Sequence, residues 1–414
     1  MQKVKNKLVC IICFFLVLLT SCSNNEMHAN SENKQKYADA PLDFVEIIVD
    51  KEGCGWKWYA EEKVLVLDGL ELYWDGTESF SGSAITVPPD SVIKLSDGSV
   101  NIIGVMTSGG NISAIVCEEP NGNITFEGDG QLILKGESRY GIDSNSGTVA
   151  INSGNISIQD DKNWAIAAGN ELIINGGTIE SEIGVIEARE AIVINGGDIS
   201  LASYGDCMRS EFKNEIILNG GNVALKWLPG YEADWADYTE KQMAIHTSDD
   251  KWTINDGNLF TTGIYTNGIF EVNGGNVTVS DAGLNVGIRG AFIQNGGNVS
   301  ITSDYAGIGN WVYSAEDNVA ENRVVLNSGE LDITCTDERY NAIELILEKK
   351  RGQNVLGTGI IIGDNMKIND GEWITEDITK DSEIRLRDDL QDFSEEREYL
   401  LTALQSKQVS ITSQ

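Results

Sequence analysis

The sequence predicts an all-β protein: a right-handed, single-stranded parallel β-helix, a solenoid of roughly eleven coils with a short C-terminal helical cap. Three observations predict this fold. An Asn-Gly-Gly signature bracketed by β-branched residues recurs along most of the chain, a second signature lies between its copies, and the commonest interval between copies is about twenty to twenty-four residues. That interval lies in the period range of solenoid proteins, and the right hand follows the usual preference of parallel crossover connections.

The Asn-Gly-Gly signature predicts a turn between two short strands. Apolar residues alternate before and after each copy, as in Asn219–Val223, and the glycines suit a turn that needs a positive φ. A local hairpin is the alternative, but it gives no reason for a second recurring signature between copies. Aligned on the final glycine, the copies are Gly98, Gly130, Gly154, Gly177, Gly197, Gly221, Gly257, Gly275, Gly297, Gly329 and Gly371.

The second signature is a small residue followed by Ile, and it predicts another strand in each coil. We expect Val and Ile to point inward and stack on their copies, and the asparagines to form ladders at the corners. Two long intervals, Gly221 to Gly257 and Gly297 to Gly329, predict loops that project from single coils, where binding surfaces tend to lie. The copies are Ala114-Ile115, Gly141-Ile142, Ala165-Ile166, Ala244-Ile245, Gly263-Ile264, Gly307-Ile308 and Ala342-Ile343.

The N-terminus predicts secretion and a lipid tether. Residues 1–21 have a lysine-bearing start and an apolar run from Leu8 to Leu19, as in a lipoprotein signal peptide. Leu19-Thr20-Ser21-Cys22 resembles a bacterial lipobox, so Cys22 is the expected lipidated residue. An ordinary signal peptide or an N-terminal membrane helix is the alternative, although the run is short for a spanning helix. Residues 22–40 are low in apolar residues and predict a flexible tether.

We therefore expect an extracellular protein on the bacterial cell surface, lipid-anchored, with residues 41–377 forming the β-helix. Residues 378–414 depart from the repeat and predict a C-terminal cap. Within it, Ser394–Lys407 has a Ser N-cap followed by Glu, and apolar residues at helical spacing, which predicts a short amphipathic helix over the open end of the solenoid.

The net charge excludes several partners. The formal charge is −34, and removing residues 1–21 deletes three lysines and no acid, which gives −34 − 3 = −37. A surface this acidic repels nucleic acid and anionic lipid, so we expect a monomer whose membrane contact is the N-terminal anchor alone. The acidic surface is compatible with Ca2+ as a partner, because Ca2+ prefers clustered carboxylates and carbonyls. The cysteines of the folded part, Cys54, Cys117, Cys207 and Cys335, are expected to be small buried residues; disulfides in one of three connectivities are the alternative.

The opening of the folded part carries a family resemblance. Gly55–Gly76 contains a Gly-Trp-x-Trp start and a Leu-x-Leu strand, and Ser83–Gly104 contains a Ser-Ala-Ile step before the repeats begin. This order resembles bacterial cell-surface carbohydrate-binding β-helix proteins, over roughly Phe44 to Trp373. The resemblance implies a polysaccharide-binding module.

Some members of that family hold Ca2+ with paired aspartates just before a Gly-Ile step, and the resemblance implies a similar site here. The matching places here have a single aspartate each, Asp281 and Asp304, with Asp206 as a third candidate. The missing second aspartates leave ordinary solvated corner residues as the alternative.

Aromatic residues in the two predicted loops are the candidate ligand-binding residues. Aromatic faces give sugar rings an apolar platform, and the neighbouring carboxylates accept hydrogen bonds from hydroxyl groups. The alternative is that the rings pack the loops back onto the coils. The residues are Trp227, Tyr231, Trp235 and Tyr238 in one loop, and Tyr305, Trp311 and Tyr313 in the other.

A second candidate is a pair of arginines. Arg189 lies twelve residues after Gly177 and Arg209 twelve after Gly197, so we expect them in one column of adjacent coils. A salt-bridged surface with Glu187 and Glu190 is one interpretation; a site for uronic-acid carboxylates, which suit the fork of arginine, is the other.

Our hypothesis for function is non-catalytic polysaccharide binding. The chain after residue 21 has two histidines, His28 and His246, which excludes histidine-rich metal sites and a histidine relay. A β-helix polysaccharide lyase or glycoside hydrolase stays open, because many carboxylate pairs exist and none is singled out by spacing. A passive surface spacer or adhesin that contacts protein is the third class.

Overall fold

The computed structural model describes residues 40–75, 81–106, 111–160, 164–210, 215–228, 244–247, 251–280, 286–312, 324–337, 340–349, 359–378, 398–406 and 408–413. They all belong to one compact unit of the chain, Lys36–Gln414. The predicted signal peptide, Cys22 and nearly all of the tether lie outside these residues. Strands and turns account for the part described, and it contains no helix suited to crossing a membrane.

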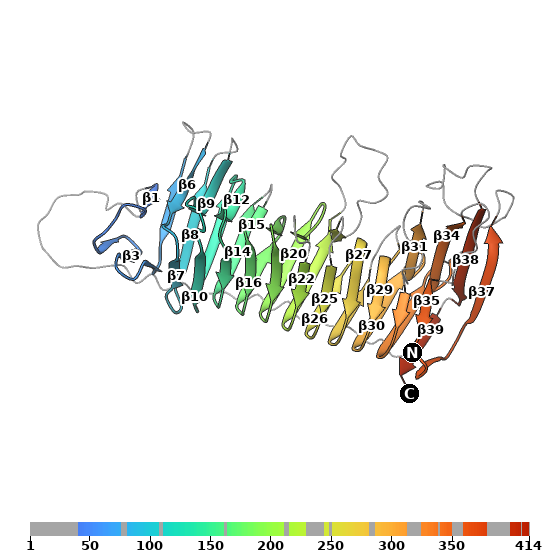
Figure 1. Cartoon of the computed structure of the whole chain (residues 1–414). Helices are drawn as coiled ribbons and strands as arrows, with labels where there is room; N and C mark the ends of the chain where they lie inside the picture. The colour runs from blue at the N-terminus through green and yellow to red at the C-terminus, as the bar shows by residue number, and fades with distance from the viewer. Residues whose placement is uncertain are drawn as a thin grey trace, which may run out of the picture. The chain divides into compact units, whose positions relative to one another are not determined.

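Three stacks of strands, sheets A, B and C, make up the fold (Figure 1). Sheet A consists mainly of parallel strands that each begin after an Asn-Gly-Gly type turn, with two antiparallel strands at its C-terminal edge. Its strands, in spatial order, are β5 (Glu71–Trp74), β8 (Val100–Val105), β11 (Gln131–Gly136), β14 (Asn155–Asp160), β17 (Thr178–Ser181), β20 (Asp198–Ser203), β23 (Asn222–Trp227), β26 (Asn258–Thr261), β28 (Asn276–Val279), β30 (Asn298–Ser303), β33 (Glu330–Cys335), β39 (Gln408–Ser413) and β36 (Met366–Ile368).

Sheet B holds the strands of the small-residue-Ile signature. It contains β1 (Leu42–Asp43), β6 (Ser81–Thr86), β9 (Asn111–Cys117), β12 (Tyr140–Ser144), β15 (Trp164–Ala168), β18 (Val185–Ala188) and β21 (Met208–Ser210). A hydrogen bond from Cys207 N to Ala244 O, 2.9 Å, continues the row to β24 (Ile245–Thr247). The row then passes through the first parts of β27 (Ile264–Val272) and β29 (Ile288–Gln294) to β31 (Ile308–Val312) and β34 (Ile343–Lys349).

Sheet C completes each coil. It opens with an antiparallel meander of β2 (Lys51–Gly53), β3 (Trp56–Tyr59) and β4 (Val64–Leu67). Parallel strands follow: β7 (Ser91–Leu95), β10 (Ile124–Gly128), β13 (Val149–Ile151), β16 (Glu171–Ile174), β19 (Ala191–Ile194), β22 (Glu215–Leu218), β25 (Lys251–Ile254), the second parts of β27 and β29, β32 (Val324–Leu326) and β35 (Ile360–Ile362).

The chain runs through sheets C, A and B in turn and then pairs with itself one coil later, as β10, β11 and β12 do with β13, β14 and β15. Identical positions of the repeat therefore meet, for example Asn222 and Asn258. An all-β chain with long parallel sheets in this order is consistent with the predicted solenoid.

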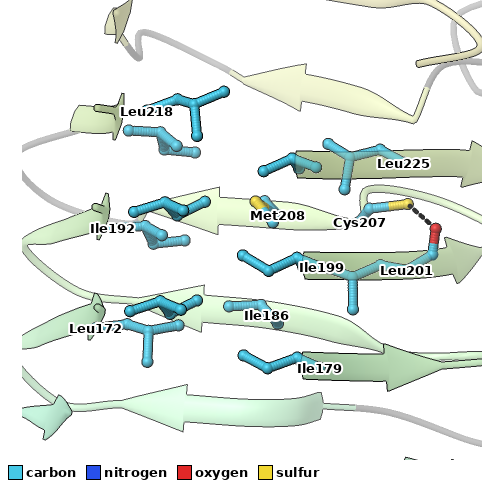
Figure 2. Close-up of a cluster of buried hydrophobic side chains, with 14 of the residues drawn as sticks. Leu172, Ile179, Ile186, Ile192, Ile199, Leu201, Cys207, Met208, Leu218 and Leu225 are labelled. Carbon is cyan, nitrogen blue, oxygen red and sulfur yellow. Dashed lines mark hydrogen bonds between the residues drawn. The ribbon is translucent and has the colours of Figure 1, made fainter. Parts of the chain in front are cut away.

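Aliphatic columns form the core. The Ile of the second signature meets its copies along sheet B, where Ile115, Ile142, Ile166 and Ile186 are aligned and fully buried. Figure 2 shows one part of this core, with Leu172, Ile179 and Ile186 from the three sheets. The prediction of inward stacking is confirmed.

The four cysteines within the described residues are all free. Three of them are buried, as predicted, and Cys207 donates a hydrogen bond from its thiol to Leu201 O at 3.8 Å (Figure 2). The prediction is wrong for Cys54, which is exposed because it lies in the turn between β2 and β3.

The repeat glycines have the positive φ that the sequence predicts, such as 87° at Gly221. A Cβ at Gly221 would lie 2.5 Å from Gly197 O in the adjacent coil, so this position needs glycine. The alignment is wrong in two places. Gly128, not Gly130, has the positive φ in its turn, and Gly371 precedes an antiparallel strand, β37 (Glu372–Ile378), rather than a further parallel coil.

Two asparagine ladders flank the turns and confirm the predicted corner ladders. In the first, each Nδ2 donates to the Oδ1 of the preceding member at 2.7–2.9 Å; its members are Asn152, Asn175, Asn195, Asn219, Asn255, Asn273, Asn295 and Asn327. The second runs from Asp198 through Asn222, Asn258 and Asn276 to Asn298, at 2.6–2.9 Å.

The predicted C-terminal helix is wrong. Residues Glu398–Gln405 form strand β38, which pairs antiparallel with β34 on one side and β37 on the other. A short apolar run is compatible with either a strand or a helix. The last coil exposes unpaired backbone N–H and C=O groups, and a strand satisfies them whereas a helix does not.

Candidate functional site

The outer face of sheet B carries a line of polar residues. In β12, β15, β18 and β21 the residue after the buried Ile or Met is only partly buried, and the strand register aligns these residues, which are Asp143, Ala167, Glu187 and Arg209. Farther along, the equivalent position is Tyr265 on β27, aligned with Arg289 on β29. Charged and aromatic residues are thus brought into one column from segments far apart in the sequence.

Two aromatic rings lie beside this column. Tyr140 and Trp164 occupy aligned positions on β12 and β15, with ring centroids 5.3 Å apart and planes inclined by 27°. The guanidinium carbon of Arg139 lies 5.2 Å from the Tyr140 centroid and 4.9 Å from the Trp164 centroid. Cation–π attraction and ring stacking therefore hold the three side chains together.

Glu187 connects the rings to Arg209. Its Oε2 accepts hydrogen bonds from Trp164 Nε1 and from Nε and Nη2 of Arg209, the Nε bond being 3.0 Å long. The Glu187 side chain is only 14% exposed, so the ion pair is shielded from water on one side. The guanidinium of Arg209 also lies 6.0 Å from the Trp164 centroid. We call Arg139, Tyr140, Asp143, Trp164, Glu187, Arg189 and Arg209 the B-face cluster.

Asp143 has an altered acidity. Burial raises the pKa of its carboxyl from 3.8 to about 6; the Ser113 hydroxyl, which donates to Oδ2 at 3.4 Å, lowers this pKa, as does the charge of Arg189. Near pH 6 the protonated and ionised forms coexist, so this carboxyl can both donate and accept hydrogen bonds.

The arginines that the structure describes lie on this face. Within the described residues, the arginines are Arg139, Arg189, Arg209 and Arg289, and each lies in or next to a strand of sheet B. Arg289 lies over the ring of Tyr265 at 4.7 Å. In a chain with 64 acidic residues, this concentrates planar, multivalent donors beside carboxylate acceptors. Such a mixture suits a ligand with many hydroxyl groups.

The predicted arginine column is wrong in register. Arg209 is aligned with Glu187, while Arg189 lies one residue beyond β18, where its N donates to Ala168 O at 3.1 Å. Counting from the turn glycine fails because β20 is a six-residue strand and β17 a four-residue strand. The salt-bridge interpretation is confirmed for Glu187.

The aromatic loop residues are only partly described. Trp227 packs against the core and its Nε1 donates to Tyr204 O at 3.2 Å, which matches the interpretation of a ring that anchors the loop. Tyr305 packs against Tyr340, with centroids 4.5 Å apart. The remaining predicted residues, Tyr231, Trp235, Tyr238, Tyr313 and the side chain of Trp311, lie outside the described residues.

Of the two predicted calcium residues, the one that the structure describes, Asp304, does not belong to a cluster of possible metal ligands. Asp304 accepts a hydrogen bond from the Thr336 hydroxyl, and Asp281 lies outside the described residues. Across the described ranges, His, Cys, Asp and Glu nowhere gather in a group of three that could hold a metal ion.

Sequence reasoning missed most of the B-face cluster. The available signal was the residue after each small-residue-Ile step, which is Asp143 in one coil and Tyr265 in another. Trp164 directly precedes such a step. The signature predicted the buried column, and the same register places its neighbours on the outer face.

The fold is that of a repeat protein, and the B-face cluster is a partly exposed group of charged and aromatic side chains on one of its sheets. The model of a family described as Carbohydrate-binding domain-containing protein matches residues 59–285, which is more than half of the chain and includes the whole cluster. The chain belongs to this family. Comparison with curated proteins and with solved structures gave no match.

Proposed function

We propose that this chain is an extracellular, lipid-anchored, non-catalytic polysaccharide-binding protein, built as a right-handed parallel β-helix, whose glycan-contact surface is the B-face cluster. Family membership supports carbohydrate as the ligand class. The signal-like residues 1–21 and Cys22 support secretion and anchoring. The stacked parallel sheets support the β-helix.

The observation that carries the choice of surface is the network centred on Glu187, which fixes Trp164 and Arg209 in place before any ligand arrives. Groups held in this way lose little conformational entropy on binding. Arg139, Arg209 and Asp143 then present donors and acceptors to sugar hydroxyls. The edges of Tyr140 and Trp164 supply apolar contact, since their stacked faces cover each other.

The main surface for polysaccharide contact is then the outer face of sheet B and not the aromatic loops that the sequence predicted. The ring of Trp227 is engaged by the core and by Tyr204 O, so it contributes to loop position. Ca2+ stays in the proposal as a helper of binding through Asp281 and Asp304, because a resemblance in sequence suggests it.

The test is affinity electrophoresis of the chain Ser23–Gln414 in gels containing neutral or acidic polysaccharides, with Ca2+ or with a chelator. The cluster variant carries Arg139→Gln and Arg209→Gln, and Trp227→Ala is the matched loop variant. We expect an acidic polysaccharide to retard the wild type, with loss of this retardation in the cluster variant and retention in Trp227→Ala.

Retardation that survives in the cluster variant but disappears in Trp227→Ala would return the site to the loop. An absence of retardation by every glycan would reject carbohydrate binding and favour the protein-contacting spacer. An unsaturated product absorbing in the ultraviolet, or release of reducing sugar, would show that the protein is an enzyme. A chelator that abolishes retardation would assign a role to Ca2+.

A further inference from the structure

The outer face of sheet A carries a second regular surface. Strands β23, β26, β28 and β30 align Asn222, Asn258, Asn276 and Asn298 in one column. Two residues later, the same strands align Ala224, Phe260, Thr278 and Ser300. Residues two apart in a strand share a face, so the two columns lie side by side. We call these eight residues the A-face shelf.

Phe260 is exposed although it lies in the middle of a sheet. Its residue exposure is 50%, whereas Leu259 and Thr261 on either side of it are 0% and 4% exposed. The core therefore uses the alternate residues, and the ring of Phe260 is directed away from it. The aligned neighbours in the adjacent strands are Ala224 and Thr278, whose side chains are short. The ring is thus available to a flat apolar surface such as one face of a sugar ring.

The asparagine column next to Phe260 is a preorganised row of hydrogen-bonding groups. Asn258 Nδ2 donates to Asn222 Oδ1 at 2.7 Å, and Asn276 Nδ2 donates to Asn258 Oδ1 at 2.8 Å. A carboxamide has two N–H donors and an oxygen with two lone pairs, and the ladder uses one of each. Each interior member therefore offers a further donor and a further acceptor, repeated at the strand spacing of roughly 4.8 Å.

The A-face shelf has no charged residue, although the chain has a formal charge of −34. Acidic residues bound it along the stack. Asp198 precedes Asn222 in one column, and Glu330 and Asp332 follow Asn298 and Ser300 in β33. A neutral window between acids accepts an uncharged chain and repels a polyanion. The ligand chemistry expected here differs from that of the arginine-rich B-face cluster.

We propose that the A-face shelf is a second glycan-contact surface, which takes an uncharged polysaccharide lying across β23, β26, β28 and β30 with one sugar ring on Phe260. The ligand class rests on the proposed carbohydrate-binding function. The family match supports the same region, because residues 59–285 include β23, β26 and β28. Hydroxyl groups of the chain bond to the asparagine row.

The experiment is affinity electrophoresis of the chain Ser23–Gln414 with neutral polysaccharides, namely xylan, mannan, dextran and a β-glucan, and with polygalacturonate as the acidic probe. Phe260→Ser removes the ring, and Thr278→Glu places a charge in the neutral window. Ile269→Ser is the matched control, since Ile269 is an aliphatic residue of sheet C that is 37% exposed. Thermal unfolding checks that each variant is folded.

We expect at least one neutral polysaccharide to retard the wild type, and Phe260→Ser and Thr278→Glu each to weaken its binding about tenfold or more. Ile269→Ser should bind it as the wild type does. Equal binding by Phe260→Ser and wild type would overturn the assignment. Retardation by polygalacturonate alone would overturn the second surface and leave the proposed function standing, whereas no retardation by any probe would reject both.

Discussion

The outer faces of sheets A and B use the same repeating backbone in opposite ways. Along sheet A, one position is Asn in four successive coils, from Asn222 to Asn298, and each copy bonds to the next. Along sheet B, the aligned residues change from Asp143 to Ala167, Glu187 and Arg209. A column of identical residues forms a ladder of equivalent, exposed hydrogen bonds. A column of unlike residues forms individual side-chain interactions that are not repeated in the neighbouring coils.

The largest difference in stability between the two faces is expected when one glutamate is removed from sheet B and one from sheet A in the same coil. Glu187→Ala removes the carboxylate to which Arg209 and the indole N–H of Trp164 both donate, and we expect a loss of about 3 kcal/mol in the free energy of unfolding. Glu180→Ala, an exposed residue of β17 on sheet A, should change it by less than about 0.5 kcal/mol. Urea unfolding of both variants measures the contrast, and equal losses would refute it.

Asp143 offers a second contrast, through pH. Its pKa is raised to about 6, so the native state binds more protons than the unfolded state between about pH 4 and 6, and stability falls as pH rises through that window. Asp143→Asn imitates the protonated form and should be about 2 kcal/mol more stable than wild type at pH 7, because the raised pKa of Asp143 is the net of the cost of burial and the attraction of Arg189 and Arg139.

Unfolding by urea at pH 3.5, 5, 6 and 7 tests this expectation. The two proteins should converge at the lowest pH, where Asp143 is protonated in both states. Asp332→Asn, an exposed aspartate on the outer face of sheet A, is the matched control and should follow the wild-type pH dependence. A constant offset between Asp143→Asn and wild type at every pH would contradict the assigned acidity.

The contrast also explains what the sequence could predict. The turn glycines and the small-residue-Ile step are constrained by backbone conformation and by stacking on copies, so their spacing carries the fold. Gly221 and the Ile115, Ile142 and Ile166 column are examples. The same logic predicts the asparagine ladders, because their contacts join asparagine to asparagine, except at Asp198.

The B-face cluster was not predictable in this way. Its contacts join unlike residues, and their register depends on connections that vary between coils, as the misaligned Arg189 shows. The C-terminal strand β38 was missed for a related reason. Its residues pair antiparallel with strands from two other segments, which no repeat signature specifies.

A smaller effect is expected within the asparagine ladder. Asn276→Ala removes the bond that Asn276 donates to Asn258 and the one that it accepts from Asn298, and both are exposed to water. We expect a loss of about 1 kcal/mol. The double variant Asn258→Ala, Asn276→Ala should lose less than the sum of the single variants, because the two residues share one bond. Strict additivity in urea unfolding would mean that the bond between Asn258 and Asn276 contributes nothing to stability.

The smallest effect is expected at Phe260. The residue is 50% exposed and its aligned neighbours, Ala224 and Thr278, have short side chains, so Phe260→Ala should change the free energy of unfolding by less than about 0.5 kcal/mol. Leu259→Ala, one residue earlier and fully buried, should cost about 2–5 kcal/mol. Thermal and urea unfolding of the two variants compare the outer and inner sides of one strand. A large loss at Phe260 would make the ring a structural element of sheet A, and a negligible loss would leave ligand contact as the reason for an exposed aromatic residue there.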